Sequence, residues 1–502
     1  MQESVKLIEN AFVFTCDENQ RSGVLSILIR GDKIVEIGKR ADAMSAQYSQ
    51  LERINAEGKI LLPGFIDAHH RAESVVLRFL DPLFVPQQNR SLNLVRKASE
   101  YLTTKATEDE LKTLYRLAFF SALRAGVTTL SEYGMDYLDK SFRAAIEALQ
   151  QTQQRAYIGL HNGDQYEAAL LYKSKNIHYA AVLPTDRNLT LYNLQNTLRI
   201  AQQRQLPIII NDCADIHAFE SFKKKFGKGI IQLGNEHHIF DSPVFLVNVR
   251  GFDKADAELI VKRKFPVIVT PTNFSNANDN SSTVEDLINR VTIALGSGWG
   301  NANPFEEMRQ LISLYLSKSV AIASPFEILA AHTIGGAQAL SLSNEAGSIK
   351  EGKKADIVFL NASGIFHQPC LVSEDAELVL QHCISEMTAH DVADVMIGGE
   401  FYVREGHLLT CSEDELAREA SSLMKQIYSV LGEENVHQEA GLVVPFSSKK
   451  EVIDGISSDE GFRIIRDHEK INTDTNTNLE TPAQPQSIKK NLHKVFGEDD
   501  IE

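Results

Sequence analysis

The pair His69 and Arg71 is the first place in this sequence where residue types and spacing could support chemistry. The pair follows residues 63–68, Pro-Gly-Phe-Ile-Asp-Ala, which are typical of a turn entering a buried strand. Residues two apart on a strand point to the same side of the strand. Two histidines at this spacing would therefore face one divalent ion, and such an ion activates water for hydrolysis. Arg71 keeps its proton and has no lone pair to donate, so it would repel that ion.

The elements around this pair alternate between apolar runs and helical stretches. From about residue 60 to about 340, apolar runs recur at 156–160, 207–210, 244–247 and 292–295. Repeated βα units of this length predict a parallel barrel or a doubly wound sheet. Before and after this region, the pattern indicates strands and hairpins, at 6–14, 23–38, 355–360 and 395–403. We therefore predict that the two ends of the chain build one small β domain together.

Several separate segments resemble the amidohydrolase superfamily, in its chlorohydrolase and cytosine/guanine deaminase branch. They are the turn that leads to His69, Gly-Val-Thr-Thr-Leu at 126–130, Pro-Thr at 271–272, and the stretches 324–340 and 347–358. The resemblance covers about residues 5 to 410 and implies an α/β fold, a (β/α)8 TIM-type barrel plus a small β-sandwich domain built from both chain ends. Because these segments are structural signatures, they indicate the fold rather than the activity.

The resemblance also implies a set of metal ligands, most of which are replaced in this chain. On the first strand, one histidine of two is kept, at His69. On the fifth strand, the family has a histidine followed three residues later by a glutamate. Asp212 and Asp215 have that spacing, and a register slipped by one would place Asn211 and Ala214 there. Neither register restores the fifth-strand histidine.

The remaining ligand positions lie on the sixth and the last strand. The sixth-strand histidine corresponds to Asn248, a weak oxygen donor for zinc. The last-strand aspartate, which in the family touches the metal and accepts a proton, corresponds to Ser297 or Gly298. The family's hydrolysis depends on lowering the pKa of metal-bound water from 15.7 to about 7. We therefore predict an amidohydrolase-like protein, related to metal-dependent hydrolases of non-peptide C–N bonds, that is catalytically impaired or inactive and holds no metal cofactor.

Two alternatives to this interpretation stay open. One is a subunit that pairs with an active paralogue. The other is an active amidohydrolase or deaminase with one divalent metal, Zn, Fe or Mn, in an atypical site whose ligands would be His69, Asp212, Asp215 and Asn248. Its catalytic candidates are Asp212, Asp215 and Ser297. Under the inactive interpretation, Arg71 fills the place of the ion and pairs with Asp212 or Asp215.

Composition limits the partners. The chain has 502 residues, of which 43% are hydrophobic, and a formal net charge of -16, with no extended basic run that could neutralise phosphates. We predict a cytoplasmic protein that binds no nucleic acid and no membrane, with a small-molecule ligand as the possible partner. The resemblance adds the expectation of a homodimer. His161 and Trp299 are the predicted pocket residues, with packing as the alternative role for each.

The predicted organisation has five parts. They are the N-terminal part of the β-sandwich domain at 1–58, the barrel at 59–342, the C-terminal part of the β-sandwich domain at 343–411, a C-terminal helix at 412–446 and a polar tail at 447–502. Within the fourth part, the amphipathic pattern runs from about residue 413 to 431. The tail is predicted to be disordered because it is rich in Asn, Thr and Asp and has few aromatic residues.

Overall fold

The computed structural model describes most of the chain up to residue 431. The described residues are 3–76, 97–134, 139–161, 163–172, 174–185, 189–211, 216–248, 252–274, 287–317, 323–368 and 375–431. All of them belong to one compact unit, Met1–Leu442, and a second unit, Val443–Glu502, lies outside them. The predicted tail at 447–502 and the candidates Asp212 and Asp215 therefore lie outside the described residues. The domain boundaries given above stay predictions.

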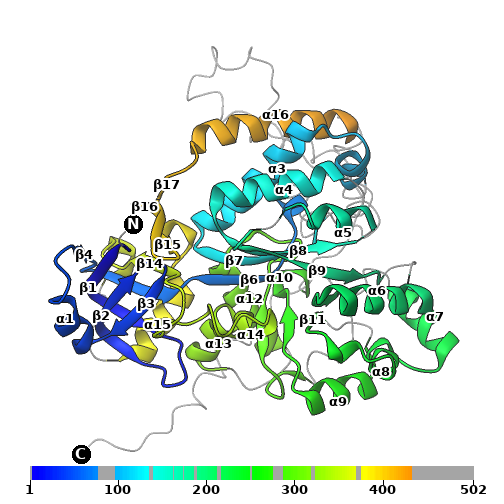
Figure 1. Cartoon of the computed structure of the whole chain (residues 1–502), viewed down its shortest axis with the longest axis horizontal. Coiled ribbons are helices and arrows are strands. Elements are labelled where there is room, and N and C mark those ends of the chain that lie inside the picture. Colours follow the sequence, from blue (N-terminus) through cyan, green and yellow to red (C-terminus); the bar gives the residue numbers. More distant parts are fainter. Residues whose placement is uncertain are drawn as a thin grey trace, which may run out of the picture. The chain divides into compact units, whose positions relative to one another are not determined.

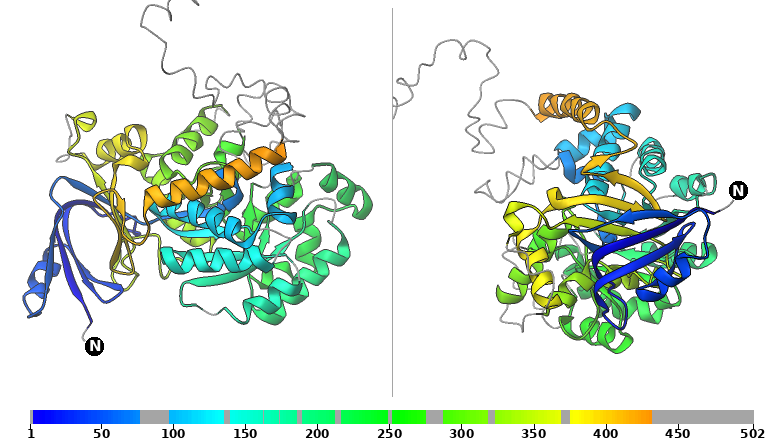
Figure 2. Two further views of the ribbon diagram at one scale, coloured as in Figure 1. Left: turned by 90° about the horizontal axis from the view of Figure 1, so that it is seen from above. Right: turned by 90° about the vertical axis from the view of Figure 1, so that its left-hand side faces the viewer.

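One sheet combines strands from both ends of the described chain. Its order is β17-β16-β15-β14-β5-β1-β2-β3, with β4 beside β1. The strands are β1 (Val5–Phe14), β2 (Ser22–Arg30), β3 (Lys33–Ile37), β4 (Glu52–Asn55), β5 (Lys59–Pro63), β14 (Ile357–Asn361), β15 (Val392–Ile397), β16 (Glu400–Arg404) and β17 (His407–Leu408). β5 pairs antiparallel with β14, and Figure 2 shows the two groups of strands side by side. The predicted joint β domain is thus confirmed.

Between these two groups of strands, the chain forms a nearly closed barrel of parallel strands. In barrel order, they are β6 (Phe65–His70), β7 (Val127–Glu132), β8 (Arg155–Leu160), β9 (Ile177–Leu183), β10 (Ile208–Ile210), β11 (Val244–Val247), β12 (Val267–Val269) and β13 (Ile293–Leu295). A parallel bridge between His70 and Gly298 brings the end of β13 back to β6. The (β/α)8 barrel is confirmed, and the doubly wound sheet is excluded.

The barrel interior is filled with apolar side chains, including Ala68, Ala180, Ile209 and Ile268, all of which are buried. Such an interior is a packed core and not a channel. Polar side chains with a chemical role must therefore lie at the strand ends. In a barrel of this kind, the carboxyl ends of the strands form the face that carries function.

Helices surround the barrel (Figure 1). The α-helices are α1 (Lys39–Ser45), which packs on the first sheet, and then α3 (Glu108–Arg124), α4 (Asp139–Thr152), α5 (Gly163–Ala169), α6 (Leu191–Arg204), α7 (Ile216–Phe226), α8 (Ile230–Glu236), α9 (Lys254–Arg263), α10 (Pro271–Phe274), α12 (Pro304–Ser317), α13 (Pro325–Ala331), α14 (Ile334–Ala339), α15 (Ala376–Glu386) and α16 (Glu413–Leu431). The 3-10 turns are η1 (Ala72–Val76), η4 (Ile239–Asp241), η5 (Ile365–His367) and η6 (Ala389–Asp391).

The last described helix, α16, corresponds to the amphipathic segment predicted at about 413–431. It lies along α3, and an ion pair of 2.5 Å between Arg116 and Glu419 joins the two helices. None of the described helices has the length and apolar character needed to cross a membrane.

A buried ion pair joins the barrel to the first sheet. Arg155 begins β8, and Asp356 directly precedes β14. Their side chains are 5% and 4% exposed, and Arg155 Nη1 lies 2.9 Å from Asp356 Oδ2. The other carboxylate oxygen accepts a hydrogen bond from the backbone N–H of Gly398, at 2.8 Å. Both charges are therefore satisfied away from water, a condition that makes the loss of one partner costly.

Asp256, in the first turn of α9, provides a prediction of pH dependence. Burial raises its pKa from 3.8 to about 6, and hydrogen bonds from Gln232 oppose that shift. Because the folded-state pKa lies above the unfolded value, the group favours folding below pH 3.8 and loses that contribution as the pH rises through about 6. Asp256→Asn should therefore raise the free energy of unfolding at pH 7.5 by about 2 kcal/mol and change it little at pH 4. Urea unfolding at the two pH values checks this, and an equal gain at both would contradict it.

Candidate functional site

His69 lies at the carboxyl end of β6 with an unpartnered ring nitrogen. Its side chain is buried, and no described residue forms a hydrogen bond with Nδ1. Burial, helped by the charges of Arg71 and His70, lowers the pKa of His69 to about 3, so the imidazole is neutral. Gly296 lies so close to the His69 backbone that a Cβ there would come within 2.7 Å of its nitrogen. A neutral, buried imidazole with a free lone pair fits the role of a metal ligand.

Ser297, a predicted catalytic candidate, is bound to Asp67. Its hydroxyl donates to Asp67 Oδ2 at 2.5 Å, and its backbone N–H donates to Oδ1 at 2.9 Å. This contact joins the end of β13 to β6, so Ser297 positions a carboxyl group of the first strand. Burial raises the pKa of Asp67. Gly298 has a φ of +54° and reaches the site only through its backbone N–H, which donates to the His69 carbonyl oxygen at 2.8 Å.

Arg71 pairs with Glu73, in the turn that follows β6. Its Nη2 lies 3.1 Å from Glu73 Oε1. The guanidinium carbon lies 4.6 Å from the ring centre of Tyr133 and 4.0 Å from that of Trp299. The predicted pairing with an aspartate of the fifth strand concerns residues outside the described part. The acidic partner that the structure provides is Glu73, which the sequence reasoning missed.

The neighbouring His70 points away from the barrel interior. Its ring lies 5.7 Å from that of Phe119 in α3, and its Nδ1 lies 2.6 Å from Glu132 Oε2. Glu132, at the end of β7, also accepts the backbone N–H groups of Ala72 and Gly134. This network fixes the turn after β6 and thereby the position of Arg71.

His161, a predicted pocket residue, lies at the end of β8 and contacts the same tyrosine as His69. Its Nε2 lies 2.8 Å from the carbonyl oxygen of Tyr133, so Nε2 carries the proton in this hydrogen bond. The Tyr133 ring meets the His161 ring at 5.0 Å and the His69 ring at 5.4 Å, both edge to face. Tyr133 was missed by the sequence reasoning, and its one signal was its place directly after a barrel strand.

Two asparagines end the fifth and sixth strands. Asn211 follows β10, and its buried Oδ1 has no partner among the described residues. Asn248 follows β11 and has a φ of +59°. Its Oδ1 accepts the backbone N–H of Thr270 at 2.8 Å, while its Nδ2 donates to the Thr270 hydroxyl at 2.9 Å. The Asn248 side chain is therefore hydrogen-bonded to Thr270, after the end of β12. The Asn211 oxygen forms no hydrogen bond with the described residues.

Glu307, in α12, is a buried acid that the sequence reasoning also missed. It forms a short hydrogen bond with the hydroxyl of Thr272, in the Pro-Thr turn after β12. Burial raises the pKa of Glu307 well above its usual range, which favours the protonated form of the carboxyl group. No sequence spacing linked Glu307 to the site, because its helix is distant in sequence from β6 and β7.

The fit of a metal to these residues is partial. Nowhere in the described part of the chain do three His, Cys, Asp or Glu side chains gather as a metal site would require. His69 offers an unpartnered nitrogen and Asn211 an unpartnered oxygen. Each of these donors is of a kind that binds a divalent ion, and further ligands would have to come from residues that the structure does not describe or from the rotation of an engaged side chain.

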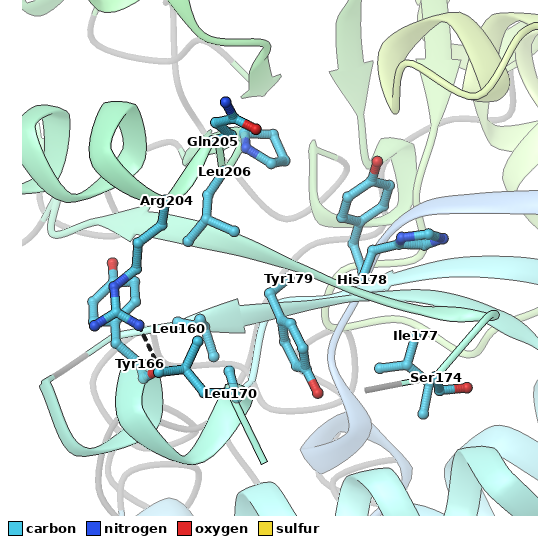
Figure 3. A pocket seen from close by; sticks show the side chains of 13 residues that line it. Leu160, Tyr166, Leu170, Ser174, Ile177, His178, Tyr179, Arg204, Gln205 and Leu206 are labelled. Carbon is cyan, nitrogen blue, oxygen red and sulfur yellow. Dashed lines mark hydrogen bonds between the residues drawn. The ribbon is translucent and has the colours of Figure 1, made fainter. Parts of the chain in front are cut away.

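A separate cavity lies on the outer wall of the barrel (Figure 3). It measures about 480 Å³ and is lined by residues of β8, β9, α5 and the segment that leads into β10, among them Tyr166 and Tyr179. Arg204 donates to the carbonyl oxygen of Tyr166 at 2.9 Å, a bond drawn in Figure 3. Neither His161 nor Trp299 lines this cavity. The predicted pocket role of these two residues is untested by it.

Comparison with known proteins identifies the family. The profile of the amidohydrolase family matches residues 60–402, more than half of the sequence. The chain belongs to the amidohydrolase family. Its sequence is 23% identical over 446 residues, 84% of this chain and 98% of the relative, to a 5-methylthioadenosine/S-adenosylhomocysteine deaminase of Caldicellulosiruptor saccharolyticus. It is 25% identical over 452 residues, 85% of this chain and 99% of the relative, to a 5'-deoxyadenosine deaminase of Methanocaldococcus jannaschii.

Solved structures show the same fold. An adenosine deaminase from Xanthomonas campestris with bound zinc superposes with a TM-score of 0.71 at 20% identity, over 84% of this chain and 98% of that one. The atrazine chlorohydrolase TrzN from Arthrobacter aurescens TC1, complexed with zinc, has a TM-score of 0.68 at 19% identity, over 84% of this chain and 100% of that one.

These findings contradict two of the predictions made from the sequence. The relatives that align over most of this chain are named as deaminases, which argues against a catalytically impaired or inactive protein. The zinc in the solved structures argues against the absence of a metal cofactor. Both predictions were wrong for the same reason. They counted only residues at the family's ligand positions and did not consider Asp67 or Glu307, whose side chains contact Ser297 and Thr272 beside the last two barrel strands.

Proposed function

We propose that this protein is an active amidohydrolase that hydrolyses the bond to an exocyclic amino group, with an aminopurine nucleoside as the substrate class. The deaminase names of relatives that span the chain support the reaction class. The observation that carries the proposal is His69, a neutral imidazole at the carboxyl end of the first barrel strand whose Nδ1 has no partner among the described residues. At the face of a barrel that carries function, such a nitrogen is available to a metal.

One divalent ion, Zn, Fe or Mn, belongs to this proposal. We assign His69 as one ligand, and Asp212, Asp215 and Asn248 as the positions that complete the set. Asn248 would have to turn its oxygen from Thr270, its present partner. An ion bound there would supply Lewis-acid activation of water for attack on the ring carbon that bears the amino group.

Residues of the chain itself would handle protons and orientation. Burial raises the pKa of Glu307 and so favours its protonated form, and we assign its carboxyl group as the donor of a proton to the leaving amine. Ser297 acts as a positioning residue in this assignment, because its hydroxyl is held by Asp67. The roles of Asp212 and Asp215 as catalytic candidates remain part of the proposal.

A metal-removal experiment tests this function. Purified protein should contain about one divalent ion per chain by elemental analysis and should deaminate 5'-deoxyadenosine or adenosine, as followed by the change in ultraviolet absorbance. A chelator should lower the rate by about 100-fold or more, and added Zn, Fe or Mn should restore it. Protein without bound metal that stays inactive on both nucleosides under all three ions would contradict the proposal.

We include in this proposal a homodimer, a small-molecule partner and a cytoplasmic location. Mass measurement by size-exclusion chromatography with light scattering would test the homodimer. A mass of one chain across a range of protein concentrations would argue against the dimer.

A further inference from the structure

Arg71 combines three features that a purely structural arginine does not need. Its guanidinium carbon lies over two aromatic rings, 4.6 Å from the ring centre of Tyr133 and 4.0 Å from that of Trp299. One edge is occupied by Glu73, because Nε and Nη2 both point to the single oxygen Oε1, at 3.2 and 3.1 Å. The side chain is nevertheless 17% exposed, and the Trp299 residue is 38% exposed.

These contacts leave one direction open for a ligand. A guanidinium forms hydrogen bonds only in its own plane, so the contacts with the two rings do not use its N–H donors. Within the plane, no described residue accepts a hydrogen bond from Nη1, so the fork formed by Nη1 and the second N–H of Nη2 stays unoccupied. That fork matches the two oxygens of a carboxylate or a phosphate. Glu73 meanwhile balances the charge when no ligand is present.

The position of this fork relates it to the reaction. Arg71 follows His69 by two residues, and the Tyr133 ring contacts both side chains, at 5.4 Å for His69 and 4.6 Å for Arg71. A group bound by the fork would therefore lie beside the same tyrosine ring that His69 contacts. Tyr133 is in turn held through its carbonyl oxygen by His161.

We propose that Arg71, which lies over the rings of Tyr133 and Trp299, binds an oxyanion of the substrate, so that the preferred substrate carries a carboxylate or phosphate group beside the ring that loses its amine. This inference rests on the proposed function, because it takes the bound anion to be part of the molecule that is deaminated. The binding step itself can be tested without turnover. Arg71 is a specificity-determining residue in this arrangement.

Trp299 makes the test direct, because it is the only tryptophan of the chain. Protein as purified and chelator-treated protein are titrated with sodium phosphate and, separately, sodium succinate, at constant ionic strength kept with sodium chloride. The fluorescence of Trp299 should change saturably with at least one of the two anions. Arg71→Met should weaken that response by about tenfold or more, and Arg71→Lys should weaken it less, because lysine keeps the charge but loses the planar fork.

Arg404→Met is the matched control. Arg404 also lies over an aromatic ring, 3.9 Å from the centre of Phe401, but in β16 of the first sheet. Its variant should titrate like the unmodified protein. Arg71→Met/Glu73→Gln removes both charges and keeps the test valid if the single variant folds poorly. An unmodified protein without saturable response to either anion, or an Arg71→Met variant with an undiminished one, would overturn the inference. Neither result depends on deaminase activity.

Discussion

His69→Ala should lower the deaminase rate by about a thousandfold or more and remove most of the bound metal. The imidazole is the one described donor at the end of the first barrel strand that is both neutral and unpartnered, so no neighbouring side chain is placed to replace it. The metal content, measured by elemental analysis, and the deamination rate, measured in the nucleoside assay, should fall together. Because Nδ1 makes no hydrogen bond to the described residues, its removal should leave the far-ultraviolet circular dichroism spectrum unchanged.

His178→Ala is the matched control for that prediction. His178 is a half-buried histidine whose Nε2 is buried and has no hydrogen-bond partner among the described residues, and burial lowers its pKa as well. It lies near the start of β9, at the opposite end of the barrel strands from the candidate site. Its variant should keep both metal and activity. If His69→Ala retains its metal and its rate, His69 is not a ligand and the assigned site is wrong.

Asp356→Ala should lower the free energy of unfolding by about 3–5 kcal/mol, the second large effect. The substitution leaves the Arg155 guanidinium, which is 5% exposed, with only the exposed Glu345 carboxylate, 3.9 Å from its Nε, as a charged partner. It also removes the acceptor of the Gly398 N–H. Thermal and urea unfolding should both show the loss. Activity at low temperature should persist, because the ion pair lies at the start of β8 and not at its carboxyl end.

Two comparisons isolate the cause of that loss. The double variant Arg155→Met/Asp356→Leu should recover much of the stability, because it removes the unpaired charge together with its partner. Glu258→Ala breaks an exposed pair with Arg290, whose side chains are 55% and 41% exposed, and should cost less than about 1 kcal/mol. A similar loss for the exposed and the buried pair would show that the buried charge is not the cause.

The fold could be predicted from the sequence because its signals are local and repeated. Apolar runs of strand length recur between helical stretches, and the segments at 126–130 and 324–340 have residue types that the family's barrel requires. The β-domain strands were recognisable at both chain ends, although pairing of β5 with β14 joins segments about 300 residues apart. The domain boundaries and the tail remain predictions.

The candidate site could be predicted only in part. His69 and Arg71 were singled out from their spacing, and the structure places both at the carboxyl end of β6. The partner of Arg71, the engagement of Ser297 by Asp67 and the presence of Glu307 were not predicted. These contacts join residues from different strands and helices, so no fixed spacing along the chain records them.

By itself, the sequence determined the α/β barrel with its composite β domain and the neighbourhood of His69 as the place to look for chemistry. It did not determine the charges and hydrogen-bond partners of the residues around His69. Counting the replaced ligands led to the wrong expectation of an inactive protein. Only the tertiary structure decided that His69 is neutral and that its Nδ1 has no partner in the described part of the chain, and that Arg71 pairs with Glu73 and lies over two aromatic rings. The physical reason is that burial and partner choice depend on which strand ends meet, and these are set by barrel closure.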